Sequence, residues 1–311
     1  DVTGDGVGDG YGHGTFVAGL VAGSTLGVAP GAQILDVRVG HNDGSTSLID
    51  VMAGLQAVSE NPNVRVVNLA LSTDGEVPPL TDALDALWAQ GDTVVVPAGN
   101  DGPDRGTVTS PGTDPTLLTV GALDGSAVAT WSSRGGGGPA KPDLVAPGAH
   151  LLSVGLPGSV IWTANPAAQR PGTQFVGSGT SFSTAVAAGA AAVLLAGHPG
   201  VAPDQVKSLV VKTASKVSGS RDATGAGGLD LTTALTSRVG HGSGSRSGSS
   251  DGSGDGDSSW DASSWSARQW SARQWSARQW SDAQWAARQW SARQWSARQW
   301  SARQWSDSSW E

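Results

Sequence analysis

The feature that most constrains the fold is a series of short apolar runs that alternate with amphipathic helical patterns. The runs are rich in β-branched residues, read as strands, and occupy residues 32–39, 64–71, 92–99 and 116–123. Strands that are apolar on both faces and joined by helices are typical of a parallel sheet covered on both sides. The pattern predicts an α/β fold with three αβα layers around a mostly parallel, doubly wound sheet. Ligands are expected at the carboxyl ends of its strands.

Four longer segments read as helices. Residues 47–61 carry apolar side chains at helical spacing, and residues 80–91 do the same before a glycine that ends the helix. Two further helices are predicted to begin at Thr180 and at Pro203, the second with proline in its first turn. The apolar face of the first helix consists of Leu48, Val51, Met52, Leu55 and Val58.

The composition changes near residue 240 and divides the chain into three parts. Residues 1–239 read as one globular domain, large enough to bury most of its surface without disulfides. Residues 240–259 are a Gly/Ser/Asp linker by composition. Residues 260–311 repeat the pentapeptide Ser-Ala-Arg-Gln-Trp. A period of five suits neither a helix nor a strand, so this tail is predicted to be mostly disordered when unbound.

Charge and cysteine content exclude several classes of function. The chain has no cysteine, which rules out disulfides, thiolate metal sites and cysteine nucleophiles. Its net charge is −8, and the acids are concentrated in the globular part, which argues against nucleic acid as a ligand. The apolar segment 185–197 is too short to cross a bilayer, so no membrane span is expected.

Three stretches far apart in the sequence carry candidate catalytic residues. His13 lies between two glycines, Asn100 follows the buried run 92–99 in a turn, and Ser181 opens a long helix. A serine hydroxyl is a poor nucleophile unless a base removes its proton, and His13 is the candidate base. The side-chain amide of Asn100 and the backbone N–H of Ser181 are candidate donors for an oxyanion.

These stretches, in this order, resemble the sequence blocks of the subtilase family of serine peptidases. The family's histidine block matches residues 12–19, its oxyanion asparagine turn matches 98–100, and its nucleophile block matches 179–185. Ala185 stands where the family usually has proline. The resemblance implies a subtilisin-like peptidase domain over residues 1–239.

The function implied by the resemblance is that of a serine endopeptidase. Ser181 would be the nucleophile, His13 the general base and Asn100 an oxyanion-hole donor. The implied substrates are polypeptides, and the implied location is extracellular or at the cell envelope.

The resemblance also implies where a substrate binds. Subtilases hold an extended substrate as an added β-strand between two segments of the chain. The matching primary pocket is apolar and uncharged, which predicts cleavage after larger apolar residues. The implied substrate-binding residues are Gly44, Ser45, Thr46, Ala70, Leu71, Ser72, Pro97 and Gly99.

The third member of the family's triad, an aspartate on the first strand of the sheet, has no counterpart in this sequence. That aspartate holds the imidazole in the correct tautomer and stabilises the imidazolium. Asp1 is close to His13 in sequence but follows no strand, and Asp1, Asp5 and Asp9 read as a solvated polar loop. We therefore expect an N-terminally truncated subtilase that lacks the Asp-bearing strand and is weak or inactive by itself.

No metal and no cofactor are expected. The segment between the helix of His13 and residues 27–30 is too short to hold the calcium-binding loop that many subtilases carry there.

The tryptophan-rich tail leaves a second class of function open. Its eleven tryptophans, interleaved with arginines, suit weak but additive contacts with glycans or the cell envelope. A repeat expansion without a ligand and a β-helical stack are the alternatives. The rival to a peptidase is therefore a noncatalytic surface or binding protein, with a degenerate subtilase body and the tail as its working part.

Overall fold

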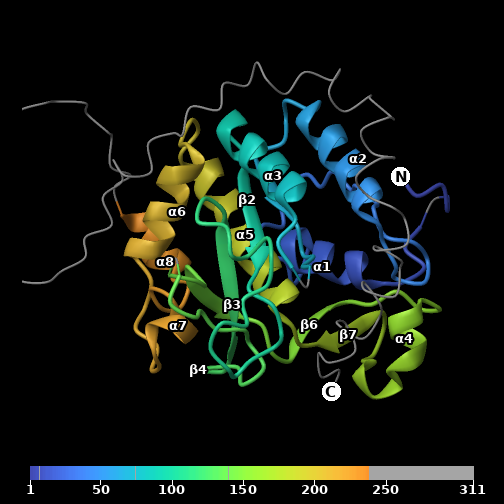
Figure 1. Ribbon diagram of the computed structural model, residues 1–311. Coiled ribbons are helices and arrows are strands. Elements are labelled where there is room, and N and C mark those ends of the chain that lie inside the picture. Colours follow the sequence, from blue (N-terminus) through green and yellow to red (C-terminus); the bar gives the residue numbers. More distant parts are fainter. Residues whose placement is uncertain (7, 74, 139, 238–311) are drawn as a thin grey trace, which may run out of the picture.

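The computed structural model describes residues 1–6, 8–73, 75–138 and 140–237, and Figure 1 shows their arrangement. The predicted linker and tail lie outside these residues. The domain boundaries at 239 and 259 therefore stay predictions.

A five-stranded sheet forms the centre of the fold. Four strands run parallel in the spatial order β1, β2, β3, β5, and β4 folds back antiparallel on the end of β3. Every residue of β2 is buried, as expected for a strand covered on both faces. The strands are β1 (Val66–Asn68), β2 (Thr93–Pro97), β3 (Leu118–Asp124), β4 (Ala127–Val128) and β5 (Leu144–Pro147).

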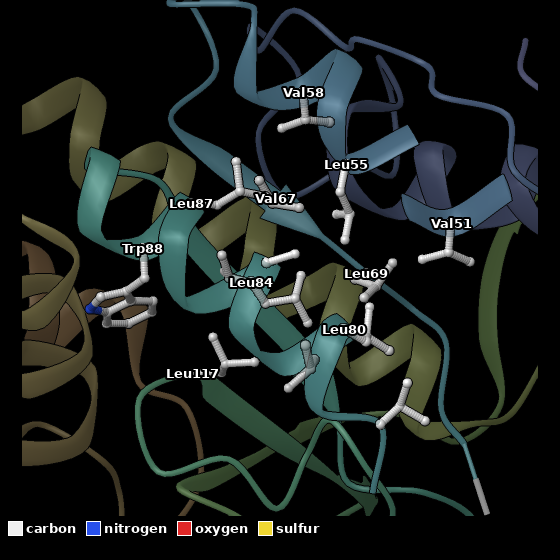
Figure 2. Close-up of a cluster of buried hydrophobic side chains, with 14 residues drawn as sticks. Val51, Leu55, Val58, Val67, Leu69, Leu80, Leu84, Leu87, Trp88 and Leu117 are labelled. Atoms are coloured by element: carbon white, nitrogen blue, oxygen red, sulfur yellow. The ribbon is translucent and has the colours of Figure 1, made fainter. Parts of the chain in front are cut away.

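Helices cover both faces of the sheet, as the sequence pattern predicted. Figure 2 shows the core beneath α2 (Leu48–Ser59) and α3 (Pro78–Gln90). Successive β2 residues alternate between the two cores, because side chains along a strand point to opposite faces. Val94 and Val96 belong to this core, whereas Val95 belongs to the core beneath α5.

The second face is covered by a helical layer centred on α5 (Thr180–Gly197). By length and composition, α5 is the one helix of the described chain that is apolar enough to cross a membrane, but 72% of it is buried in this core. The other helices are α1 (His13–Ala22), α4 (Val160–Ala164), α6 (Pro203–Lys212), α7 (Arg221–Thr224) and α8 (Leu231–Thr236), with a 3-10 turn at Pro166–Ala168.

A small antiparallel pair, β6 (Leu151–Val154) and β7 (Gln174–Gly177), lies beside α1. The hydroxyl of Ser153 in β6 donates to the carbonyl of Phe16 at 2.8 Å and ties this pair to α1.

The predicted helices are confirmed, but one predicted strand is wrong. Residues 32–39 form no strand in the described chain. Val37 and Val39 pack against the core under α2, whereas Ile34 and Leu35 remain 48% and 49% exposed. The segment has suitable residues but no neighbouring strand to complete a ladder, since β1 is paired only with β2 among the described residues.

A buried ionic cluster joins the amino ends of β3 and β5 to α6. The Asp143 carboxylate lies 2.8 Å from Lys141 Nζ and 3.1 Å from Lys207 Nζ, and its Oδ2 also accepts from the Thr119 N–H. Lys207 donates to the carbonyls of residues 115–117. Burial lowers the pKa of Lys141 to about 7, and the negative charge of Asp143 opposes that shift. The cluster lies at the opposite ends of the strands from Asn100, which supports a structural role for Asp143.

Replacing Asp143 with Asn is expected to destabilise the fold by about 3–5 kcal/mol, because two lysine side chains lose the buried counter-charge of Asp143. Urea unfolding followed by circular dichroism measures this loss. The matched control is Asp124→Asn, at an exposed carboxylate at the end of β3. A loss for Asp143→Asn no larger than that of the control would show that the cluster does not hold the sheet to α6.

Candidate active site

The three candidate catalytic residues come from segments that converge at one edge of the sheet. Helix α1 begins at His13, and α5 begins at Thr180, one residue before Ser181. The ring centroids of His13 and Phe182 are 5.6 Å apart. Asn100 follows the carboxyl end of β2 and hydrogen-bonds to Thr180. The fold therefore places all three residues around the first turn of α5.

The backbone leading into His13 is held by the segment that begins α4. The Val160 N–H donates to the Gly10 carbonyl at 2.9 Å, and the Ile161 N–H donates to the Tyr11 carbonyl at 3.1 Å. Gly12 has φ +100°, and a Cβ there would collide with the Ser159 hydroxyl. Glycine is needed at this position both for its backbone conformation and for this close approach.

His13 is a buried residue, with 9% of its surface exposed. Burial lowers its pKa to about 3, because an imidazolium loses its hydration there, and the negative charge of Asp9 opposes the shift. The imidazole is therefore neutral at neutral pH, which is the form that accepts a proton.

Ser181 lies in the first turn of α5 and is 6% exposed. Its hydroxyl donates to the Ala70 carbonyl over a long distance of 3.4 Å. Amides at a helix N-terminus lack intrahelical acceptors and carry the positive end of the helix dipole. This environment favours negative charge next to the Ser181 hydroxyl.

Asn100 is oriented by Thr180. Its Oδ1 accepts hydrogen bonds from the Thr180 N–H at 3.0 Å and from the Thr180 hydroxyl at 2.9 Å. Since these donors engage the oxygen of the carboxamide, the Nδ2 amino group is its remaining donor end.

The predicted substrate-binding residues occupy three segments near this edge. Ala70 contacts Ser181 through its carbonyl. Gly44 packs so closely on the Tyr11 ring that a Cβ would collide with it. Pro97 ends β2, and Gly99, at φ +107°, packs against Thr109 and Ser133.

The remaining predicted substrate-binding residues flank these positions. Ser45 accepts from the His41 N–H through its carbonyl, and Thr46 pairs with Gly40. Leu71 and Ser72 are half-buried residues after Ala70. The substrate-binding roles of these segments stay predictions.

Two residues that orient the site were missed by sequence reasoning. The interpretation of Asp9 as a solvated loop residue is wrong, because its half-buried carboxylate accepts from the Gly12 N–H at 2.6 Å and the Thr15 N–H at 2.7 Å. An aspartate shortly before a helix, with threonine in the first turn, is a capping signal that could have been read. Thr180 was recognised only as part of a motif, since nothing in the sequence links it to Asn100.

Asp1, by contrast, is exposed, and its carboxylate accepts hydrogen bonds from Thr3 and Gly6 in its own loop. Among the described residues, no group of three or more His, Asp and Glu side chains is arranged to hold a metal ion.

Known proteins are similar to this chain in sequence. The chain is 35% identical over 211 residues to the serine protease AprX of Bacillus subtilis (strain 168), covering 61% of this chain and 48% of AprX. It is 30% identical over 209 residues to subtilisin DY of Bacillus licheniformis, covering 65% of this chain and 69% of that protein. The chain thus spans about half the length of AprX.

Two solved structures share the fold. A cold-adapted subtilisin-like serine proteinase aligns with a TM-score of 0.58 and 32% identity, over 70% of this chain and 73% of that one. Fervidolysin from Fervidobacterium pennivorans, a keratinolytic enzyme related to subtilisin, aligns with a TM-score of 0.63 and 29% identity, over 74% of this chain and 37% of that one.

These structures confirm the predicted subtilisin-like α/β fold. A model of the subtilase family, peptidase S8, matches residues 1–242. The chain therefore belongs to the subtilase family.

Proposed function

We propose that this chain carries the nucleophile, base and oxyanion hole of a serine endopeptidase. The observation that supports this most strongly is the convergence of His13, Asn100 and Ser181 on the first turn of α5. Family membership supports the same reaction class.

In the proposed reaction, Ser181 Oγ attacks the carbonyl carbon of the scissile peptide bond while His13 takes the hydroxyl proton. The oxyanion is stabilised by the Asn100 side-chain amide and the Ser181 N–H. The C–N bond then breaks, and His13 gives its proton to the departing amine, which leaves an acyl-enzyme. Water, activated by His13, hydrolyses the ester and regenerates the serine.

The proposed substrate is an extended polypeptide that pairs as a β-strand between residues 44–46 and 70–72. Pairing through the backbone accepts many sequences. Leu71, Pro97 and Gly99 form the proposed primary pocket, which carries no charge and favours a large apolar side chain before the cleaved bond.

The stabilisation of the His13 imidazolium is the step that limits the proposed activity. In subtilases an aspartate on a separate strand stabilises the imidazolium, and its loss lowers turnover about 10⁴-fold. The carboxylate of Asp9 is engaged with the first turn of α1. The chain is therefore proposed to be a poor enzyme until a strand bearing a carboxylate is added beside β1. The exposed Ile34 and Leu35 support an incomplete sheet, as does β1, which pairs on one side only among the described residues.

Ser181→Ala should abolish covalent labelling of the chain by a fluorophosphonate probe, because the variant lacks the nucleophile. Labelling is measured by gel fluorescence and intact mass, with Ser183→Ala as a control in the same helix. A wild-type chain that remains unlabelled, yet shows native circular dichroism, would favour the rival noncatalytic binding protein.

Asn100→Ala should lower the rate of peptide hydrolysis roughly 10²–10³-fold, the loss seen when subtilisin loses its oxyanion asparagine. The rate constant kcat is measured with a chromogenic peptide that has a large apolar residue before the cleaved bond. Thr180→Val, which removes one donor to Asn100 Oδ1, should give a smaller loss. Unchanged kcat in Asn100→Ala would remove Asn100 from the oxyanion hole.

His13 should make the fold sensitive to acid. Its pKa is about 3 in the folded chain against an ordinary 6.5, so the unfolded chain binds more protons between these values. Stability is therefore fully present above pH 6.5 and is lost as the pH falls towards 3, by up to about 1.4 kcal/mol per pH unit.

Urea unfolding at pH 7, 6, 5 and 4 tests this dependence. The stability difference between wild type and His13→Gln should shrink as the pH falls below 6.5, whereas His41→Gln, at a partly exposed histidine, serves as the control. A difference that stays constant with pH would contradict the buried, neutral state of His13.

A further inference from the structure

We infer that Asp9 is the positioning residue of His13, because one carboxylate caps the helix that begins with the histidine and supplies negative charge beside it. This inference rests on the proposed function and extends it to a residue outside the predicted site. It departs from the family's triad arrangement, in which a strand supplies the carboxylate.

The first support is the hydrogen bonding of the Asp9 carboxylate. Oδ1 accepts from the Gly12 N–H at 2.6 Å, and Oδ2 accepts from the Thr15 N–H at 2.7 Å and the Thr15 hydroxyl at 2.8 Å. The N-cap position, Gly12, has no side chain with which to cap the helix. Asp9, which precedes the helix, therefore caps α1 in place of Gly12. Its hydrogen bonds hold the first turn, which includes His13.

The second support is the electrostatics of the first turn. His13 is the first residue of α1, so a proton taken up by its imidazole adds positive charge at the positive end of that helix. The first turn of α5 brings a second positive helix end nearby, since Phe182 contacts the His13 ring. Burial adds a desolvation cost. Among the described residues, Asp9 is the charged group whose negative charge opposes these effects.

Other charged groups near this segment are engaged elsewhere. Arg38 and Asp5 form an ion pair at 3.4 Å in the neighbouring loop, and His41 lies between Asp5 and Asp50. Burial raises the pKa of Tyr11 to about 12, so Tyr11 is neutral. Strand β6, which packs on α1, consists of Leu, Leu, Ser and Val and brings no charge.

The chain offers a matched control for capping without this charge effect. At the start of α8, Asp230 accepts from the Thr233 N–H and the Thr233 hydroxyl, both at 2.8 Å. This is the same pair of contacts that Asp9 makes with Thr15. Asp230→Asn therefore measures the cost of weakening an aspartate–threonine cap at a helix away from His13.

The test compares Asp9→Asn, Asp230→Asn and wild type by NMR titration of the His13 ring, assigned with His13→Gln. Asn keeps an acceptor oxygen but removes the charge. We expect His13 in Asp9→Asn to begin protonating at a pH about one unit lower than in wild type, the size of effect typical of a nearby opposite charge. Asp230→Asn should leave the titration unchanged. Coinciding titrations in Asp9→Asn and wild type would overturn the inference.

Fluorophosphonate labelling adds a kinetic readout. A shift of one pKa unit corresponds to a tenfold factor, so Asp9→Asn should label about tenfold more slowly than wild type, and Asp230→Asn at the wild-type rate. An unlabelled wild type would refute the proposed function, while the NMR titration would still decide the role of Asp9. If Asp9→Asn does not fold, Asp9→Ser, which also keeps an oxygen acceptor without the charge, replaces it in both measurements.

Discussion

The site depends on the meeting of two helix N-termini at one edge of the sheet. Unpaired amides and the dipoles of α1 and α5 make this region favourable for a developing oxyanion and unfavourable for a developing imidazolium. In the proposed reaction, the same electrostatic field therefore favours the oxyanion and disfavours the imidazolium. A negative charge near the histidine therefore favours the proposed reaction, whichever residue supplies it.

Much of the fold could be predicted because its strands and helices carry local signals. The fully buried strand β2 and the helices α2 and α3 follow from β-branched runs, helical spacing and a glycine stop at Gly91, which has φ +111°. Residues 32–39 carry equally good strand signals and fail, because a strand also needs a hydrogen-bonded neighbour. Pattern alone cannot supply that partner.

The candidate site was predictable where residues lie inside recognisable blocks. His13, Asn100 and Ser181 were found in this way. Contacts between distant segments were not predictable, because no local sequence pattern indicates them. Examples are the hydrogen bond from Thr180 to Asn100 and the hydrogen bonds from the start of α4 to residues 10–11. Asp9 lies between these cases: its capping signal is local, but its effect on His13 needs the folded geometry.

The unpaired segment 32–39 has a consequence for the lifetime of the molecule. Its backbone forms no strand, and Ile34 and Leu35 present large apolar side chains to solvent. An irregular, exposed and apolar segment of this kind resembles the extended apolar polypeptide proposed as the substrate. Under the proposed function, this segment would therefore be open to cleavage by other copies of the protein.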